Sequence, residues 1–124
     1  MNLSVSIGVD IVEIERIKKA ISCYQDAFLN RIYTNTELNY CNNMPSRLAG
    51  RFAAKEALIK VLGTGGFGVN WKEIEIISTE SGAPEIQLTG KVKDKASLIG
   101  ITGFSLSLSH EKKYALACVV GNVN

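Results

Sequence analysis

The longest regular pattern in the chain is a helical stretch near its centre. Residues 52–60 are strong helix formers such as Ala, Leu, Lys and Glu, and no Gly or Pro interrupts them. Pro45 and Ser46 are residues that commonly open a helix, and Gly63 is one that commonly ends it. We therefore expect one long helix that begins at Pro45 and runs to Leu62.

Shorter elements are expected on both sides of this helix. Residues 4–10 alternate and then run apolar, which predicts a strand, whereas Ile14, Ile17 and Ile21 recur at helical spacing within residues 12–22. The other expected elements are short helices at 26–32 and after the capping-box pattern 34–37, strands at 74–78 and 85–88 around a turn at 81–84, an amphipathic helix at 91–99, and a hairpin of strands 104–108 and 114–120. The pattern predicts an α+β fold in which residues 1–124 form a single domain, with a long central helix packed on an antiparallel sheet.

Composition narrows the class of protein. A chain of 124 residues is long enough for one modest core, and no transmembrane run or secretory signal is visible. Its three cysteines are widely spaced, which favours reduced thiols in a cytoplasmic protein over a disulfide framework or a zinc site. The net charge of +2 gives no support for nucleic-acid binding, so we expect neither nucleic acid nor a membrane as a partner.

Two acidic residues are candidates for a metal site. Asp10 lies in the apolar run 7–12, where a buried carboxylate needs a cation or a reaction to balance it. Glu56 lies in the long helix, four residues before Lys60. Two carboxylates suit Mg²⁺, which keeps several waters and binds substrate phosphates, and they are few for Ca²⁺. The alternative for Glu56 is an ordinary surface ion pair with Lys60 one turn away.

Basic residues also follow the long helix. Arg47, Arg51 and Lys55 are spaced by four, so they form one ridge. Two interpretations stay open: a solvated charged face, or a clamp for phosphate groups. The Gly-rich turn at 63–68 could let backbone N–H groups approach an anion, but it follows a helix and lacks the ending of a P-loop.

The single histidine, His110, follows a predicted strand. Ser105, Ser107 and Ser109 alternate along this strand, which places the three hydroxyls on one face. This arrangement gives a polar lining but no nucleophile–base pair, so the sequence does not support a catalytic triad. A lone histidine at such a turn is most often structural or solvent-exposed.

Taken together, three motifs resemble those of a known family. They are Ile7–Ile14 (IGVDIVEI), Arg51–Lys60 (RFAAKEALIK) with Gly63–Gly65 after it, and Ser107–Glu111 (SLSHE) before the last strand. In this order they resemble the holo-acyl-carrier-protein synthases, which are the small phosphopantetheinyl transferases. The resemblance runs nearly end to end and includes the turn before Pro84 between two strands.

The resemblance implies a transferase of the corresponding small α+β type. It implies that 4′-phosphopantetheine passes from coenzyme A to a serine hydroxyl of an apo acyl carrier protein, with release of adenosine 3′,5′-bisphosphate. Asp10 and Glu56 would be the Mg²⁺ ligands, and Glu56 and Lys60 the catalytic residues. Lys60 would contact the moving phosphoryl group or protonate the leaving oxygen. The base that deprotonates the serine stays open between Glu56 and a metal-bound water near it.

The resemblance also implies a set of residues that bind coenzyme A. They are Lys55, Arg47, Arg51, Gly63, Thr64, Gly65, Ser109 and His110, with the Ser-His pair near the 3′-phosphate. Small members of the family resemble half of a larger, two-lobed enzyme, which implies a homotrimer with coenzyme A between neighbouring chains. His110 would then serve a site whose metal ligands lie on the adjacent subunit.

The implied partner is an acidic carrier protein. The implied pathway is fatty-acid biosynthesis within lipid metabolism, with specialised metabolism as the alternative that the sequence leaves open. A basic surface of Arg16, Lys18, Lys19 and Arg31 would suit that partner, although Glu13, Glu15 and Asp26 are interleaved with it and an ordinary solvated face is the alternative. Two other functions stay open: a coenzyme A- or nucleotide-binding module without catalysis, and an Mg²⁺-dependent phosphohydrolase.

Overall fold

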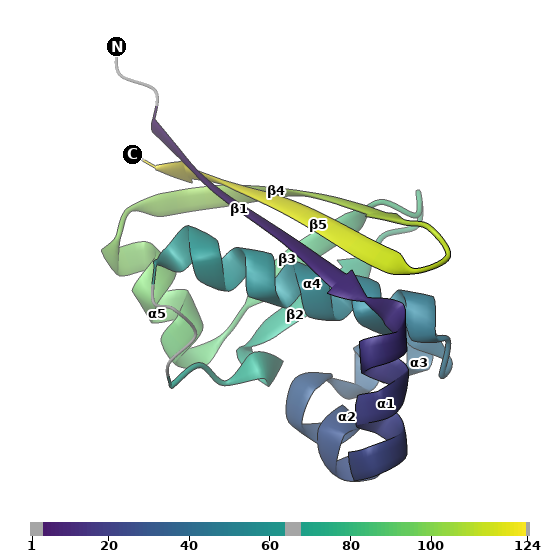
Figure 1. Cartoon of the computed structure of the whole chain (residues 1–124). Coiled ribbons are helices and arrows are strands. Elements are labelled where there is room, and N and C mark those ends of the chain that lie inside the picture. The colour runs from purple at the N-terminus through teal and green to yellow at the C-terminus, as the bar shows by residue number, and fades with distance from the viewer. Residues whose placement is uncertain (1–3, 64–67, 124) are drawn as a thin grey trace.

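The structure is a computed structural model that describes residues 4–63 and 68–123. Its elements follow the chain in the order β1 (Ser4–Glu13), α1 (Ile14–Tyr24), α2 (Asp26–Ile32), α3 (Asn35–Cys41), α4 (Pro45–Leu62), the 3-10 turn η1 (Trp71–Glu73), β2 (Ile74–Ser78), β3 (Pro84–Leu88), α5 (Gly90–Leu98), β4 (Ile101–His110) and β5 (Tyr114–Val123) (Figure 1). This is the α+β architecture that the hydrophobic pattern predicts.

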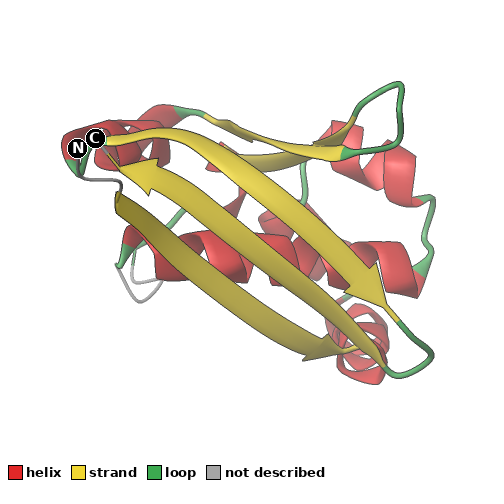
Figure 2. Ribbon diagram, turned by 90° about the horizontal axis from the view of Figure 1, so that it is seen from above, coloured by secondary structure: helices red, strands yellow, loops and turns green. Residues whose placement is uncertain are grey.

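Two antiparallel sheets accompany α4. The first has the strand order β1-β5-β4, and the second is the hairpin β2-β3. The three-stranded sheet lies across one side of α4, as seen from above in Figure 2, while α1, α2 and α3 lie on the opposite side near the start of the helix. The central strand β5 therefore separates β1 from β4, and these two strands form opposite edges of the sheet.

The contact between β1 and α4 depends on small residues. Ala53, Ala57 and Val61 of α4 are buried in the core. A Cβ atom added to Gly8 would lie 1.9 Å from the backbone oxygen of Ala57, so any larger residue would push the strand off the helix. Gly8 therefore fixes how closely the following carboxylate on the same strand face, Asp10, approaches α4.

The two faces of β1 have different environments. The sequence suggested a strand buried around Asp10, but within one chain this is only half correct. Gly8, Asp10 and Val12 face α4, whereas Ile7 and Ile11 on the other face are 59% and 61% exposed. Ile7, Val9 and Ile11 thus form an outward surface, whereas the single carboxylate lies on the inward face with Val12.

Most element boundaries agree with the sequence prediction. The helices at 26–32 and 45–62 and the strand at 74–78 have the expected ends, and the capping box of Thr34 and Glu37 is present. β1 continues to Glu13, three residues beyond its expected end, because it pairs with β5 up to Tyr114. No helix in the described residues is long and apolar enough to cross a membrane.

Candidate active site

The first part of the site lies where β1 crosses α4. The ammonium of Lys60 lies 3.2 Å from Oδ1 of Asp10 and donates a 2.7 Å hydrogen bond to the carbonyl oxygen of Val9. The side chain of Asp10 is 18% exposed, so this ion pair is partly shielded from solvent. The alternative prediction of a surface ion pair between Glu56 and Lys60 is therefore wrong, since Lys60 forms its ion pair with Asp10 of β1 instead.

Glu56 lies next to this pair and is half-buried. Burial raises the pKa of the Glu56 carboxyl, and the negative charge of Asp10 raises it further, whereas Lys60 and Arg16 act in the opposite direction. The structure thus brings Asp10 of β1 together with Glu56 and Lys60 of α4, which lie 46 and 50 residues further along the chain. The result is two carboxylates and one amine in a shared electrostatic environment.

The two carboxylates fit a divalent cation of the magnesium type. Asp10 and Glu56 repel each other, and a cation that contacts both would relieve this repulsion. Within residues 4–63 and 68–123 there is no group of three or more His, Cys, Asp or Glu side chains that could hold a metal. Mg²⁺ relies on waters and substrate phosphates for its remaining ligands, so two carboxylates are enough protein ligands for it.

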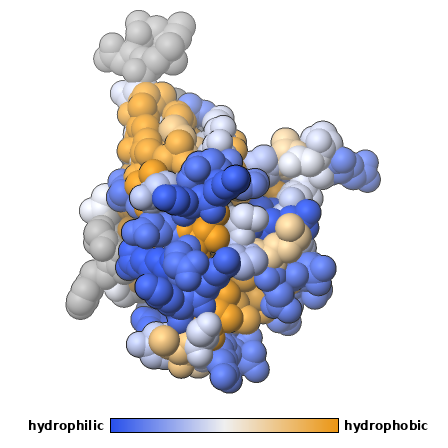
Figure 3. Space-filling model, turned by 45° about the vertical axis from the view of Figure 1, so that its right-hand side comes forward, coloured by the Kyte–Doolittle hydropathy of each residue, from blue (hydrophilic) through white to orange (hydrophobic). Residues whose placement is uncertain are grey.

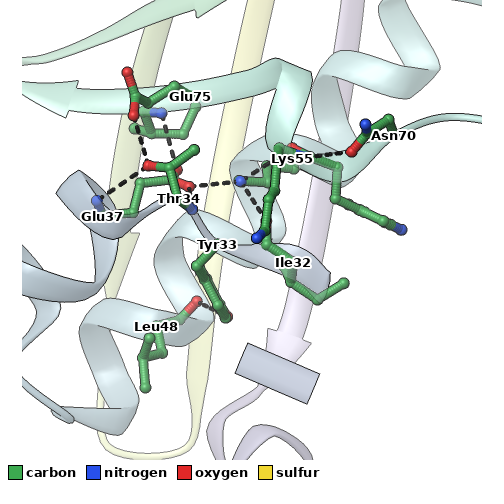
Figure 4. A network of polar contacts seen from close by, with 11 residues as sticks. Ile32, Tyr33, Thr34, Glu37, Leu48, Lys55, Asn70 and Glu75 are labelled. Carbon is green, nitrogen blue, oxygen red and sulfur yellow. Dashed lines mark hydrogen bonds and ion pairs between the residues drawn. The ribbon is translucent and has the colours of Figure 1, made fainter. Parts of the chain in front are cut away.

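Lys55, the neighbour of Glu56, has a different role from the predicted one. Its side chain is fully buried and donates to Oε1 of Glu37 at 2.6 Å, to Ile32 O at 2.6 Å and to Trp71 O at 3.1 Å (Figure 4). These three bonds use all three protons of the ammonium group. Lys55 was predicted to lie either on a solvated charged face or in contact with coenzyme A. Its buried, fully bonded ammonium group agrees with neither prediction. Burial lowers its pKa, and Glu37 opposes that shift.

The buried pair joins several elements. Oε2 of Glu37 accepts from the backbone N–H of Ile76, and the Thr34 N–H donates to Oε1. Figure 4 shows how this network links α3, α4 and β2. The pair therefore fixes α3 and β2 against the helix that carries Glu56 and Lys60, which is a structural contribution to the site.

A second part of the site is a cleft of about 350 Å³ on the other side of α4. Arg47, Arg51, Ser109 and His110 line it together, so the structure brings four of the predicted coenzyme A residues to one place. Arg51 is only 5% exposed, and its Nε is buried without a hydrogen-bond partner among the described residues. A buried, unpartnered guanidinium donor favours an anionic ligand.

Other residues of the cleft were not singled out from the sequence. Tyr40 and Ser78 line it, and so do Gly82 and Pro84 of the turn between β2 and β3. The sequence identified that turn from its Gly and Pro, but nothing in the local pattern linked it to the arginines. Tyr40 belongs to α3, and no periodicity within seven residues could indicate that it faces α4.

The two parts of the site lie on opposite flanks of α4. Arg47 and Glu56 are nine residues apart, which is about two and a half helical turns, so their side chains leave the helix in opposite directions. The positions of the strands lead to the same conclusion, because Asp10 is on the edge strand β1 and His110 is on the opposite edge strand β4. The structure therefore does not bring His110 to Asp10 and Glu56 within one chain.

The turn after α4 is described only at its first residue. Gly63 ends the helix in the left-handed conformation, with φ of 75°, and its N–H bonds to Ile59 O and Lys60 O. This confirms its role as the helix stop. Thr64 and Gly65, which were also expected to bind coenzyme A, lie outside the described residues.

Comparisons with known proteins identify the family. The model of the 4′-phosphopantetheinyl transferase superfamily matches residues 6–119. The holo-acyl-carrier-protein synthase of Thermoanaerobacter sp. (strain X514) is 48% identical over 92% of this chain and 84% of its own length, and that of Halothermothrix orenii is 46% identical over 93% and 94%. The crystal structure of the Helicobacter pylori holo-acyl-carrier-protein synthase in complex with coenzyme A aligns with a TM-score of 0.83 and 37% identity, over 93% of this chain and 98% of that one. The chain therefore belongs to the 4′-phosphopantetheinyl transferase superfamily, as its three sequence motifs indicate.

Proposed function

We propose that the chain transfers 4′-phosphopantetheine from coenzyme A to a serine hydroxyl of an apo acyl carrier protein. The main support is that Asp10, Glu56 and Lys60 lie together between β1 and α4. The chain is also similar over most of its length to holo-acyl-carrier-protein synthases. The reaction forms a bond from the serine oxygen to the phosphorus of phosphopantetheine. It breaks the bridging P–O bond of the diphosphate and releases adenosine 3′,5′-bisphosphate.

The residues of the first part divide the proton transfers. Glu56 is the proposed acceptor of the serine proton, since its carboxylate lies beside Asp10 and Lys60. Lys60 extends past Asp10, is 53% exposed and supplies a proton or a positive charge to the leaving oxygen. Asp10 and Glu56 would hold Mg²⁺, whose positive charge, when bound, balances that of the coenzyme A phosphates.

The cleft on the other flank binds the adenylate end of coenzyme A. His110, Ser109, Arg47 and Arg51 are its predicted contacts, with the 3′-phosphate beside His110. The buried Nε of Arg51 supports an anion in this cleft, because no acceptor for that donor is found among the described residues. Binding at this distance from the reacting phosphorus positions the diphosphate without taking part in the chemistry.

A complete site then requires two chains. Because Arg47 and Glu56 point in opposite directions, one coenzyme A reaches both only if one chain supplies the cleft and its neighbour supplies the carboxylates. An apolar surface is available for such an assembly. Figure 3 shows a strip of hydrophobic surface in the upper part of the view, and the outward side chains of β1 (Val5, Ile7, Val9 and Ile11) are 47% to 61% exposed.

This surface continues onto β5, where Leu116 is 41% exposed and pairs with Ile11. An exposed apolar sheet face of this kind favours burial against another protein. A homotrimer is the assembly that the family resemblance implies, and head-to-tail contacts in a closed ring would repeat the shared site three times.

The carrier protein would approach the first part of the site. Arg16, Lys18, Lys19 and Arg31 are all exposed. Among the described residues, Lys18 is the only one of these four within ion-pair distance of a carboxylate, that of Glu15 at 3.9 Å. Arg16 is also close enough to lower the pKa of Glu56, so this basic surface borders the carboxylates. An acidic carrier in a cytoplasmic fatty-acid pathway fits these charges.

The proposal is tested with purified chain, coenzyme A, Mg²⁺ and an apo acyl carrier protein. A gain on the carrier of the mass of one phosphopantetheine, lost when the accepting serine is replaced by Ala, supports the transferase. Free phosphopantetheine with an unmodified carrier would identify a phosphohydrolase. Binding of coenzyme A without any turnover would identify a binding module.

A further inference from the structure

The cleft contains two guanidinium groups without a compensating carboxylate. Arg47 and Arg51 are one helical turn apart on α4, and no Asp or Glu among the described residues lies within ion-pair distance of either. Like charges at this spacing repel each other, and burial of Arg51 makes its charge more costly. Something other than a carboxylate must hold the pair in place in the free protein.

Tyr40 contacts both guanidinium groups. The guanidinium carbon of Arg51 lies 4.0 Å from the centre of the Tyr40 ring, and that of Arg47 lies 4.8 Å from it. Arg47 also donates a 2.9 Å hydrogen bond to the backbone oxygen of Tyr40. An aromatic ring attracts cations through its negative face, so one side chain stabilises both charges without neutralising them.

Ser78 completes the arrangement from β2. Arg51 donates to its hydroxyl at 2.7 Å. A hydrogen bond with Ser78 lowers the pKa of the Tyr40 phenol, and the nearby Arg51 and Arg47 lower it as well. Arg51 Nε stays without a partner among the described residues, and both arginines line the cleft together with Ser109 and His110.

We infer that Tyr40 is a positioning residue for coenzyme A: its ring holds Arg47 and Arg51 as a pre-formed pair that receives the 3′-phosphate. This inference rests on the proposed function. It adds Tyr40 to the residues that recognise coenzyme A and explains what holds the two arginines in place. Tyr40 does not touch the reacting atoms, and its effect is on recognition of the 3′-phosphate. Preorganisation lowers the entropy lost when the arginines bind the ligand.

The test compares Tyr40→Leu, which removes the aromatic face, with Tyr40→Phe, which keeps it. For Tyr40→Leu, we expect KM for coenzyme A to rise about tenfold with kcat within about twofold of the original, as two weak cation–π contacts predict. KM for 3′-dephospho-coenzyme A should stay unchanged. Tyr40→Phe should behave like the original protein toward both substrates. Equal KM changes for the two substrates in Tyr40→Leu, or loss of discrimination in Tyr40→Phe, would overturn the inference.

A binding measurement makes the test independent of turnover and of the proposed function. Calorimetry with adenosine 3′,5′-bisphosphate and with adenosine 5′-monophosphate gives the contribution of the 3′-phosphate directly. A double-mutant cycle combines Tyr40→Leu with Arg51→Gln. The double variant should lose less bisphosphate affinity than the sum of the losses in the two single variants, because both substitutions remove the same arrangement. Additive losses would mean that Tyr40 acts apart from Arg51 and would overturn the inference. Failure of the proposed function would instead appear as intact nucleotide selectivity without transfer to the carrier.

Discussion

The ammonium of Lys60 lies 3.2 Å from a carboxylate oxygen of Asp10, so the amine at the end of one element is tied to the acid in the middle of another. The same amine donates to the backbone of Val9, which fixes its position along β1. Gly8 allows β1 to come this close to α4. The geometry of the reactive group thus depends on a glycine, a backbone carbonyl and a carboxylate, all within three consecutive residues of the strand.

Replacement of Lys60 should reduce the rate of transfer more than the affinity for substrates. Lys60→Met removes the proton and the charge beside the leaving oxygen, and we expect kcat to fall by about 10²- to 10⁴-fold, the usual range for one acid–base group. Lys60→Arg keeps the charge and should retain part of the rate. The carrier mass assay measures both. Lys91→Met, at an exposed position on α5, is the matched control. A Lys60→Met protein with the original kcat would remove this residue from the mechanism.

Replacement of Glu56 should change how stability depends on pH. The pKa of Glu56 is raised in the folded chain, mainly by burial and then by Asp10. The favourable contribution of this group is therefore complete below the ordinary carboxyl pKa of about 4.3 and is lost as the pH rises through the raised value. At neutral pH, Glu56→Gln should thus have a higher Tm than the original protein when Mg²⁺ is absent.

This difference in Tm should shrink as the pH is lowered toward about 4, because Glu56 is then protonated in the folded chain and becomes protonated in the unfolded chain as well. Thermal unfolding at several pH values, with a chelator present, measures the effect. Glu85→Gln at an exposed position of β3 serves as the control for loss of one carboxylate. A lower Tm for Glu56→Gln at every pH would contradict the role assigned to burial and to Asp10.

Replacement of Lys55 should affect stability and not coenzyme A recognition. Lys55→Met leaves Glu37 buried without its cation, and we expect the free energy of unfolding to fall by about 3–5 kcal/mol. Adding Glu37→Gln should recover part of this loss, because the neutral amide still offers an oxygen to the Ile76 N–H. Urea unfolding measures both variants. A Lys55→Met protein of normal stability but with a raised KM for coenzyme A would restore the contact that the sequence first suggested.

The sequence predicted the helices and strands better than it predicted what each of their faces contacts. Local signals were enough to predict the bounds of α4, since Pro45 and Gly63 mark its ends. The capping box was enough to predict where α3 begins. The outer face of β1 shows the limit of such signals: Ile7 and Ile11 look like core residues in the sequence but are exposed in one chain. Hydrophobicity predicts that a residue is buried somewhere, and it does not say whether its own chain or a neighbouring chain covers it.

Charged residues of the candidate site show the same distinction. Asp10 and Glu56 were first paired as hard oxygen ligands and then by the resemblance to a family, and the structure places them together. Lys55 was grouped with Arg47 because the two share a helical ridge, yet its partner is Glu37 from α3. Helical spacing gives the direction in which a side chain leaves its own helix, but the group that it meets comes from elsewhere in the fold.

The opposite directions of Arg47 and Glu56 lead to the last prediction, which concerns sites shared between chains. One variant carries Glu56→Gln, and a second carries Arg51→Ala together with His110→Ala. Each alone should have little activity, because the first lacks a complete set of carboxylates and the second lacks the cleft. When equal amounts are unfolded and refolded together, about a quarter of the shared sites should contain both intact halves in a closed ring.

Activity should therefore return to about a quarter of the original level in the mixture, as measured by the carrier mass assay. The control mixes Glu56→Gln with Asp10→Asn, because the structure places these two residues on the same flank of one chain and no pairing can then restore a site. Activity in the control mixture would show that Asp10 and Glu56 act from different chains. An inactive first mixture, with both variants folded and associated, would mean that each chain carries a whole site, so the opposite flanks of α4 would have to serve different ligands.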